Sequence, residues 1–121
     1  MWFERGRQIA AECGSVVFAH LVQHVGVRPI HCDFVFHLAG INRPKDEREF
    51  FDGNFEFTLI LLEKLNKNLN KPPILMSSSV QASLDNTYGK SKKAAEEVLF
   101  KHGNKTGSNI FIYRLPNVFG K

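Results

Sequence analysis

Residues 74–99 read ILMSSSVQASLDNTYGKSKKAAEEVL, in which a short apolar run is followed by a polar loop and then by a helical pattern. The run at 74–78 is apolar and ends in serines, which indicates a short buried strand. The loop at 80–86 ends in aspartate and asparagine, whose side chains can cap a helix that begins near Tyr88. An apolar side follows that helix, which we expect to end before Gly103. Strand, loop and helix in this order predict part of an α/β fold.

The same pattern lies on both sides of this stretch. An apolar run at 34–38 indicates a strand buried on both faces, and residues 109–115 indicate a third strand. An apolar stripe predicts helix between 46 and 69, and two prolines at 72–73 prevent its continuation. Right-handed crossovers through the two helices would place the three strands in one parallel sheet. We therefore predict an α/β fold, part of a Rossmann-like doubly wound parallel sheet.

The first 32 residues follow a different pattern. Apolar residues between 6 and 25 recur at spacings of three and four and are followed by Gly26, which predicts a helix. Val27–Ile30 could form a short extended piece. We therefore divide the chain into a segment of unclear origin at 1–32, expected to be helical, and a segment at 33–121 that contains the predicted sheet.

Composition excludes several classes of protein. The chain has 121 residues, 43% of them hydrophobic and 23% charged, which is typical of one globular domain. The net charge is +4, but the basic residues are scattered, so we expect no nucleic-acid partner. The first residues lack the order of a signal peptide, and no apolar run approaches the ~18 residues of a membrane span. We expect a cytoplasmic protein with no membrane partner. The two cysteines and five histidines lack metal-ligand spacing, so no metal site is predicted.

Tyr88 and Lys92 are four residues apart at the start of a predicted helix, so their side chains share one face. A phenol is a poor acid–base group at neutral pH, and a neighbouring ammonium group favours its ionised form. The pair could therefore transfer a proton. The same spacing often arises by chance, and an exposed lysine beside a half-buried tyrosine needs no function.

Two predicted strands end in small residues. Ser77, Ser78 and Ser79 end one strand, and Ala39 and Gly40 end the strand before it. Ligands of doubly wound sheets bind at the carboxyl ends of the strands, where a hydroxyl group could face a reacting atom. The serines could instead satisfy backbone groups at a turn, and the glycine could be an ordinary turn residue.

Five short motifs follow one another along the chain: HLAG at 37–40, GNFEFT at 53–58, SSS at 77–79, YGKSK at 88–92 and RLPNVFG at 114–120. In this order they resemble the marker motifs of extended short-chain dehydrogenases/reductases, the NAD-dependent epimerase/dehydratase family. The resemblance covers 33–121, which would make this segment the catalytic part of an NAD(P)-binding domain. The AGINRP stretch at 39–44 and the short distance from Ser77 to Tyr88 are similar to bacterial capsular-polysaccharide reductases. Those enzymes form a UDP-linked 2-acetamido-2,6-dideoxy-talose by reducing a 4-keto sugar with NADPH.

The resemblance implies roles for four side chains. Tyr88 would protonate the substrate carbonyl oxygen as hydride arrives, and Lys92 would assist it and hydrogen-bond the nicotinamide ribose. Ser79 would polarise the carbonyl, with Ser78 as the alternative because the register of a serine triplet is not fixed by sequence. Asn54 would be structural and join the central helix to the neighbouring strand. The NADP(H) or NAD cofactor would contact these residues: Ala39, Gly40, Tyr88, Lys92, Pro116, Asn117 and Val118.

The sequence departs from the family on its N-terminal side. No G-x-x-G-x-x-G turn, which would hold the cofactor pyrophosphate at a helix N-terminus, occurs among its nine glycines. The substrate-binding part and the cupin domain of the capsular relatives would follow 121. We therefore expect a fragment that lacks the N-terminal nucleotide-binding half and binds no nicotinamide cofactor in isolation. We also expect its first strand to be an exposed edge through which chains could self-associate.

Three functions remain open at this point. The first is an NAD(P)-dependent reductase acting on the 4-keto group of a UDP-linked amino sugar in capsular or surface polysaccharide synthesis. The second is a truncated non-catalytic remnant or interaction module. The third is a nucleotide-sugar epimerase or dehydratase, which would differ in substrate-binding residues outside the resemblance. We expect the isolated chain to be inactive in each case.

Overall fold

The computed structural model describes residues 16–18, 32–38, 40–41, 43–66 and 71–117. Within these residues there are four strands and three helices, together with a π-helical turn and a 3₁₀ turn. In chain order they are β1 (Val16–Phe18), β2 (Phe34–His37), α2 (Arg48–Phe50), a π-helical turn (Phe51–Glu56), α3 (Phe57–Asn66), β3 (Ile74–Ser79), a 3₁₀ turn (Val80–Ser83), α4 (Thr87–Thr106) and β4 (Ile110–Leu115). The fold is α/β.

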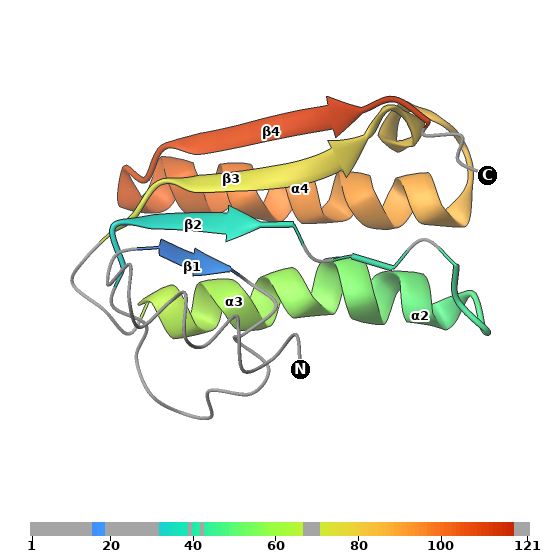
Figure 1. The fold of residues 1–121 in the computed structure, drawn as a ribbon, viewed down its shortest axis with the longest axis horizontal. Helices are drawn as coiled ribbons and strands as arrows, with labels where there is room; N and C mark the ends of the chain where they lie inside the picture. Colours follow the sequence, from blue (N-terminus) through green and yellow to red (C-terminus); the bar gives the residue numbers. More distant parts are fainter. Residues whose placement is uncertain (1–15, 19–31, 39, 42, 67–70, 118–121) are drawn as a thin grey trace.

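The four strands form one parallel sheet in the order β1-β2-β3-β4 (Figure 1). Val35 of β2 pairs with Ile74 of β3, and Ile74 in turn pairs with Ile110 of β4. The three predicted strands, their parallel order and the helices between them are therefore confirmed. Parallel neighbours need crossover connections, which α2–α3 and α4 supply.

Strand β1 corrects two predictions about the first part of the chain. We expected a helix at 6–25, but Val16–Phe18 is a strand that pairs in parallel with β2. Two valines favour extended backbone, and pairing with the sheet outweighs a helical spacing of apolar residues. Because β1 covers one side of β2 and β3 the other, β2 is not the exposed edge that we predicted. The expected extended piece at Val27–Ile30 lies outside the described residues.

Helix α4 is longer than its glycines suggested. It passes through Gly103, where we expected it to end, and continues to Thr106. The stop is Gly107, whose φ of 80° is left-handed and whose amide donates to the carbonyl of Gly103. At the other end the predicted cap is confirmed, since the Asn86 side chain accepts a 2.7 Å hydrogen bond from the amide of Gly89.

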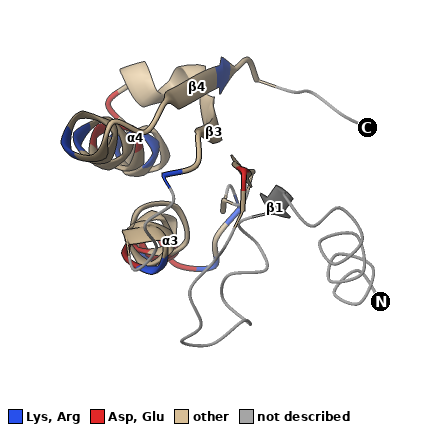
Figure 2. Ribbon diagram, turned by 90° about the vertical axis from the view of Figure 1, so that its left-hand side faces the viewer, with Lys and Arg blue, Asp and Glu red and all other residues tan. Residues whose placement is uncertain are grey.

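The core lies between the sheet and the two long helices, which are side by side on one face of the sheet (Figure 2). Its fully buried apolar side chains come from β2, β3, α3 and α4: Val35, Leu61, Leu65, Ile74, Met76, Ala95 and Leu99. Each large aliphatic side chain buried in this way contributes about 1.5–3 kcal/mol to folding. The core therefore fixes β2, β3 and α4 relative to one another, and these elements carry the predicted site residues.

Candidate active site

An open cleft of about 1130 Å³ lies at the carboxyl ends of β2, β3 and β4. Residues from these strand ends, from α2 and from the start of α4 line it, namely Leu38, Gly40, Ile41, Arg43, Glu47, Phe50, Ser77, Ser78, Ser79, Gln81, Asn86, Thr87, Tyr88, Lys92, Leu115, Pro116 and Asn117. The predicted catalytic side chains of Tyr88, Lys92, Ser78 and Ser79 are thus all brought to one cleft.

Lys92 is a nearly buried amine in this cleft, with 5% of its surface exposed. Its Nζ donates a 3.3 Å hydrogen bond to the carbonyl oxygen of Ser77, the first serine of the triplet. Burial lowers the pKa of Lys92, and the negative charge of Glu96 opposes that shift. The ammonium group is therefore held next to the end of β3, where burial removes part of its hydration and disfavours its charged form.

Tyr88 lies one helical turn before Lys92 and also lines the cleft. Its ring packs against that of Phe50 from α2, with 5.5 Å between ring centroids and 55° between planes. This tilted arrangement is a favourable one for aromatic pairs. Phe50 thereby holds the tyrosine ring at the cleft.

The hydroxyl groups of the two candidate serines, Ser78 and Ser79, have different hydrogen-bond partners. Ser78 is buried, and its hydroxyl donates to a carboxylate oxygen of Glu96. Ser79 accepts a 3.1 Å hydrogen bond from the amide of Gln81, which leaves its own hydroxyl hydrogen able to donate. Of the two, only Ser79 therefore keeps a hydroxyl hydrogen that it can donate to a ligand.

Gly40 and Asn54 organise the wall formed after β2. A Cβ atom on Gly40 would lie 2.7 Å from Lys92 Nζ and 2.8 Å from Asn54 Oδ1, so a side chain there would push against both. Asn54 Oδ1 accepts from the amide of Ile41 at 2.8 Å, and its Nδ2 donates to the Ile41 carbonyl and to Ser91 Oγ, both at 3.0 Å. Asn54 thus joins this wall to α4, which agrees with the structural role that its motif implied.

Two further lining residues are bonded to each other, since Asn117 Oδ1 accepts a 2.9 Å hydrogen bond from Gln81 Nε2. Pro116 lines the cleft beside it. Of the residues predicted to contact a cofactor, Gly40, Tyr88, Lys92, Pro116 and Asn117 therefore share one cleft. The other two, Ala39 and Val118, lie outside the described residues.

Comparisons with known proteins agree with this geometry. Residues 63–121 match an NAD-binding family model described as male sterility protein. A UDP-2-acetamido-2,6-beta-L-arabino-hexul-4-ose reductase of Pseudomonas aeruginosa is 53% identical over 89 residues, which are 74% of this chain and 24% of the reductase. The matched segment belongs to the extended short-chain dehydrogenases/reductases.

Solved structures of this family show the same arrangement of strands and helices. The capsular polysaccharide assembling protein CapF of Staphylococcus aureus matches with a TM-score of 0.60 and 47% identity, over 74% of this chain and 24% of CapF. The RMD protein of Pseudomonas aeruginosa, solved with NADPH, matches with a TM-score of 0.65 and 25% identity, over 71% and 37% of the two chains. This chain therefore spans about a quarter of the length of the reductase that it matches.

Three residues at or near this cleft were not predicted from the sequence. Glu96 is buried beneath the strand ends and forms an ion pair with Arg114 of β4. A signal existed for both, because Glu96 follows Lys92 by one helical turn and Arg114 opens the RLPNVFG motif. Phe50 was missed as well, since only the folded chain brings α2 against Tyr88.

Two further findings concern absences within the described part of the chain. It contains no cluster of three or more histidine, cysteine, aspartate or glutamate side chains that could hold a metal ion. None of its helices is both long enough and apolar enough to cross a membrane.

Proposed function

We propose that 33–121 is the catalytic segment of an NAD(P)-dependent reductase that acts on the 4-keto group of a UDP-linked amino sugar, in the synthesis of a capsular or surface polysaccharide. The observation that carries the proposal is the meeting of Tyr88, Lys92 and Ser79 in one cleft of a segment with 53% identity to a UDP-hexul-4-ose reductase. Each of the three supplies a different part of a carbonyl reduction.

In this proposal Tyr88 gives its proton to the carbonyl oxygen of the substrate, a step whose general acid is worth on the order of 10²-fold or more in rate. Lys92 compensates the negative charge that remains on the phenol oxygen, because its buried ammonium is only partly satisfied by the Ser77 carbonyl. Ser79 polarises the carbonyl, since its hydroxyl hydrogen is available while that of Ser78 is committed to Glu96. The hydrogen bonds of the two hydroxyl groups therefore favour Ser79 over Ser78.

The cleft fits the nicotinamide end of the cofactor. A bound NADPH or NADH would supply the hydride. Gly40 lines this cleft, and the space that a side chain would take there is filled by Lys92 Nζ and Asn54 Oδ1. Pro116 and Asn117 line the same cleft. RMD, a neighbour with the same fold, was solved with NADPH, which supports a nicotinamide cofactor at this cleft.

A chimera tests this proposal most directly. Residues 33–121 would replace the matching segment of the Pseudomonas reductase, and NADPH oxidation would be followed with the UDP-linked 4-keto sugar. We expect turnover within about tenfold of the parent, because most catalytic atoms of the segment would be conserved in position. The matched control is the same chimera with Tyr88→Phe, which removes one oxygen and keeps the ring.

Loss of turnover only in the Tyr88→Phe chimera supports the proposal. A folded chimera without turnover, or one in which Tyr88→Phe changes nothing, would exclude these residues from the assigned roles. Ser79→Ala and Ser78→Ala in the same chimera distinguish the two serines, since only the first should lower kcat by about 10²-fold.

A further inference from the structure

Glu96 and Arg114 form a two-bonded ion pair behind the cleft. Arg114 Nε donates to Glu96 Oε1 at 3.0 Å, and Arg114 Nη2 donates to Glu96 Oε2 at 2.7 Å. The carboxylate is buried, with 4% of its residue exposed, whereas the guanidinium side chain is 40% exposed. A planar guanidinium that bonds both oxygens fixes direction as well as distance.

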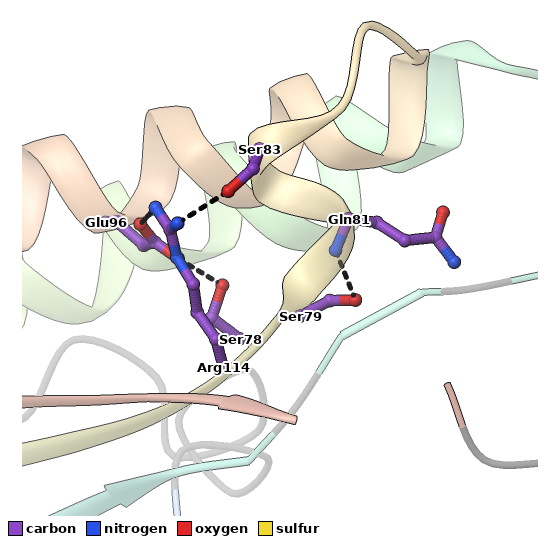
Figure 3. A network of polar contacts seen from close by, with 6 residues as sticks. All are labelled: Ser78, Ser79, Gln81, Ser83, Glu96 and Arg114. Atoms are coloured by element: carbon purple, nitrogen blue, oxygen red, sulfur yellow. Dashed lines mark hydrogen bonds and ion pairs between the residues drawn. The ribbon is translucent and has the colours of Figure 1, made fainter. Parts of the chain in front are cut away.

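The same two side chains also bond the elements on either side. Glu96 Oε1 accepts from the hydroxyl of Ser78 at 2.5 Å, and Arg114 Nη1 donates to the hydroxyl of Ser83 at 2.8 Å. Figure 3 shows the resulting network, in which α4, the end of β3, the 3₁₀ turn and β4 meet. The network therefore links four separate elements through hydrogen bonds.

Each member of the network is next to a residue of the proposed active site. Glu96 lies one helical turn after Lys92, and Ser78 precedes Ser79 in β3. Arg114 is two residues before Pro116, and Ser83 belongs to the turn that leads to Tyr88. A shift in the network would thus move all of these cleft residues relative to one another.

We propose that Glu96 and Arg114 are positioning residues, which set the ends of β3 and β4 in register with α4 and so hold Ser79 and Pro116 against Tyr88 and Lys92. The proposal rests on the function proposed above. Stability alone is a weak reason for such a pair, because apolar residues of similar size often replace a buried ion pair without loss. Register is the use for which buried charged groups are best attested.

The positioning role can be tested without cofactor or turnover. In the whole chain, Glu96→Leu with Arg114→Met removes the pair and keeps volume, and Ser78→Ala is added so that no buried hydroxyl loses its acceptor. We expect a melting temperature close to that of the unchanged chain, and amide hydrogen exchange at 78–84 and 114–117 faster by about tenfold or more. Exchange at core positions such as Leu61 and Leu99 should not change. A uniform increase at all positions, or no local increase, would overturn the positioning role.

Arg114→Lys is the second variant and keeps Glu96 paired, so the chain retains its fold. A lysine cannot bond both carboxylate oxygens and Ser83 together, so local exchange should rise at the same residues. Wild-type protection in Arg114→Lys would also overturn the proposal. The control is Asp85→Asn with Lys90→Met, which breaks an exposed pair of 2.6 Å near the start of α4 and should leave local exchange unchanged.

A site readout distinguishes positioning from a purely structural role. In chain labelled with ¹³C at lysine Cε, the signal of Lys92 should shift and broaden in both variants, because its bonded carbonyl belongs to the displaced end of β3. An unaltered Lys92 signal beside loosened 78–84 would mean that the pair does not position the lysine. These results are independent of the chimera, so failure of the reductase proposal would not alter their reading.

Discussion

The imidazole of His37 and the hydroxyl of Thr58 form a buried hydrogen bond, with 2.8 Å between Nε2 and Oγ1. The hydroxyl of Thr58 donates its hydrogen to the carbonyl of Asn54 at 2.7 Å, so it can only accept from the histidine. Nε2 of His37 therefore carries the proton. Nδ1 is buried and has no partner among the described residues. The ring is consequently neutral, with its bare nitrogen in the core behind the cleft.

His37 should resist protonation well below neutral pH. Burial, and then the positive charge of Lys92, lower the pKa of His37 to about 4. In ¹⁵N spectra we expect the ring to remain neutral at pH 5, with the proton on Nε2. A ring that titrates near its ordinary value would mean that His37 is exposed or that its bond to Thr58 does not form.

The same shift makes the stability of the fold depend on pH. The unfolded histidine binds a proton below its ordinary pKa of about 6.5, whereas the folded one does so only near 4. The free energy of unfolding should therefore fall as the pH falls from about 6.5 to 4, by at most about 3 kcal/mol from this group. Urea unfolding at several pH values measures it, and His37→Gln should flatten the curve. A His102→Gln variant is measured as well, to separate the contribution of the second histidine. Burial, and then the positive charges of Lys71 and Lys105, also lower the pKa of His102.

Much of the fold could be predicted because β2, β3 and β4 are apolar runs ended by recognisable polar or small residues. The cap at Asn86 followed from side-chain chemistry alone. Strand β1 could not be predicted in this way, because three residues carry too little pattern and owe their conformation to pairing with Phe34–Phe36. The predicted end of α4 before Gly103 was wrong for a related reason. A glycine inside a helix is tolerated where, as at Gly103, packing against Ser108 and Ile110 leaves no room for a side chain.

The candidate site was predictable where spacing along one element carried it. Tyr88 and Lys92 share a helix, so their meeting needed no tertiary information. The choice between Ser78 and Ser79 needed the partners of each hydroxyl, one of which lies 18 residues away in sequence. The Glu96–Arg114 pair likewise joins elements that only the folded sheet brings together.

Asn54 should be essential to the wall of the cleft after β2. Asn54→Ala would leave the amide of Ile41 and the hydroxyl of Ser91 without this partner. We expect a loss of about 2 kcal/mol or more, the cost of buried groups left unbonded, measured by urea unfolding. Asn104→Ala is the matched control on an exposed position of α4 and should lie within about 0.5 kcal/mol of the unchanged chain. Equal effects of the two variants would contradict the bonding described for Asn54.

Replacement of Gly89 and replacement of Gly107 should both destabilise the chain, but for different reasons. A Cβ atom on Gly89 would overlap the backbone carbonyl oxygen of Gln81, which forces α4 away from the 3₁₀ turn. Gly107 has open space around it, and only its φ of 80° opposes a side chain. Gly107→Ala should cost about 1–2 kcal/mol, and Gly107→Asn should recover part of this because asparagine tolerates left-handed backbone. At Gly89 asparagine should be no better than alanine, and a rescue there would show that space is not the constraint.

Lys92→Met should separate stability from function. Lys92 places its amine in a buried site with one long hydrogen bond, and burial lowers its pKa, so the charge is held at a cost. Methionine fills a similar volume without that cost, and we expect the chain to be as stable as before or more stable by about 1 kcal/mol. In the chimera the same change should lower kcat by on the order of 10²-fold. A strongly destabilised variant would show instead that the lysine is a structural residue.

The last prediction concerns cofactor binding by the purified chain itself. Dinucleotide affinity in this fold comes largely from a glycine-rich turn that holds the pyrophosphate at a helix N-terminus, together with a ribose contact one strand later. None of the nine glycines has the spacing of such a turn. The cleft offers the nicotinamide end only Gly40, Lys92 and the residues around Pro116 and Asn117. We therefore expect titration calorimetry with NADPH on folded monomeric chain to show no saturable heat at micromolar concentration, whereas the chimera should bind. A micromolar isotherm that Lys92→Met abolishes would mean that residues of this chain replace the glycine turn, and the cleft would then be a complete cofactor site.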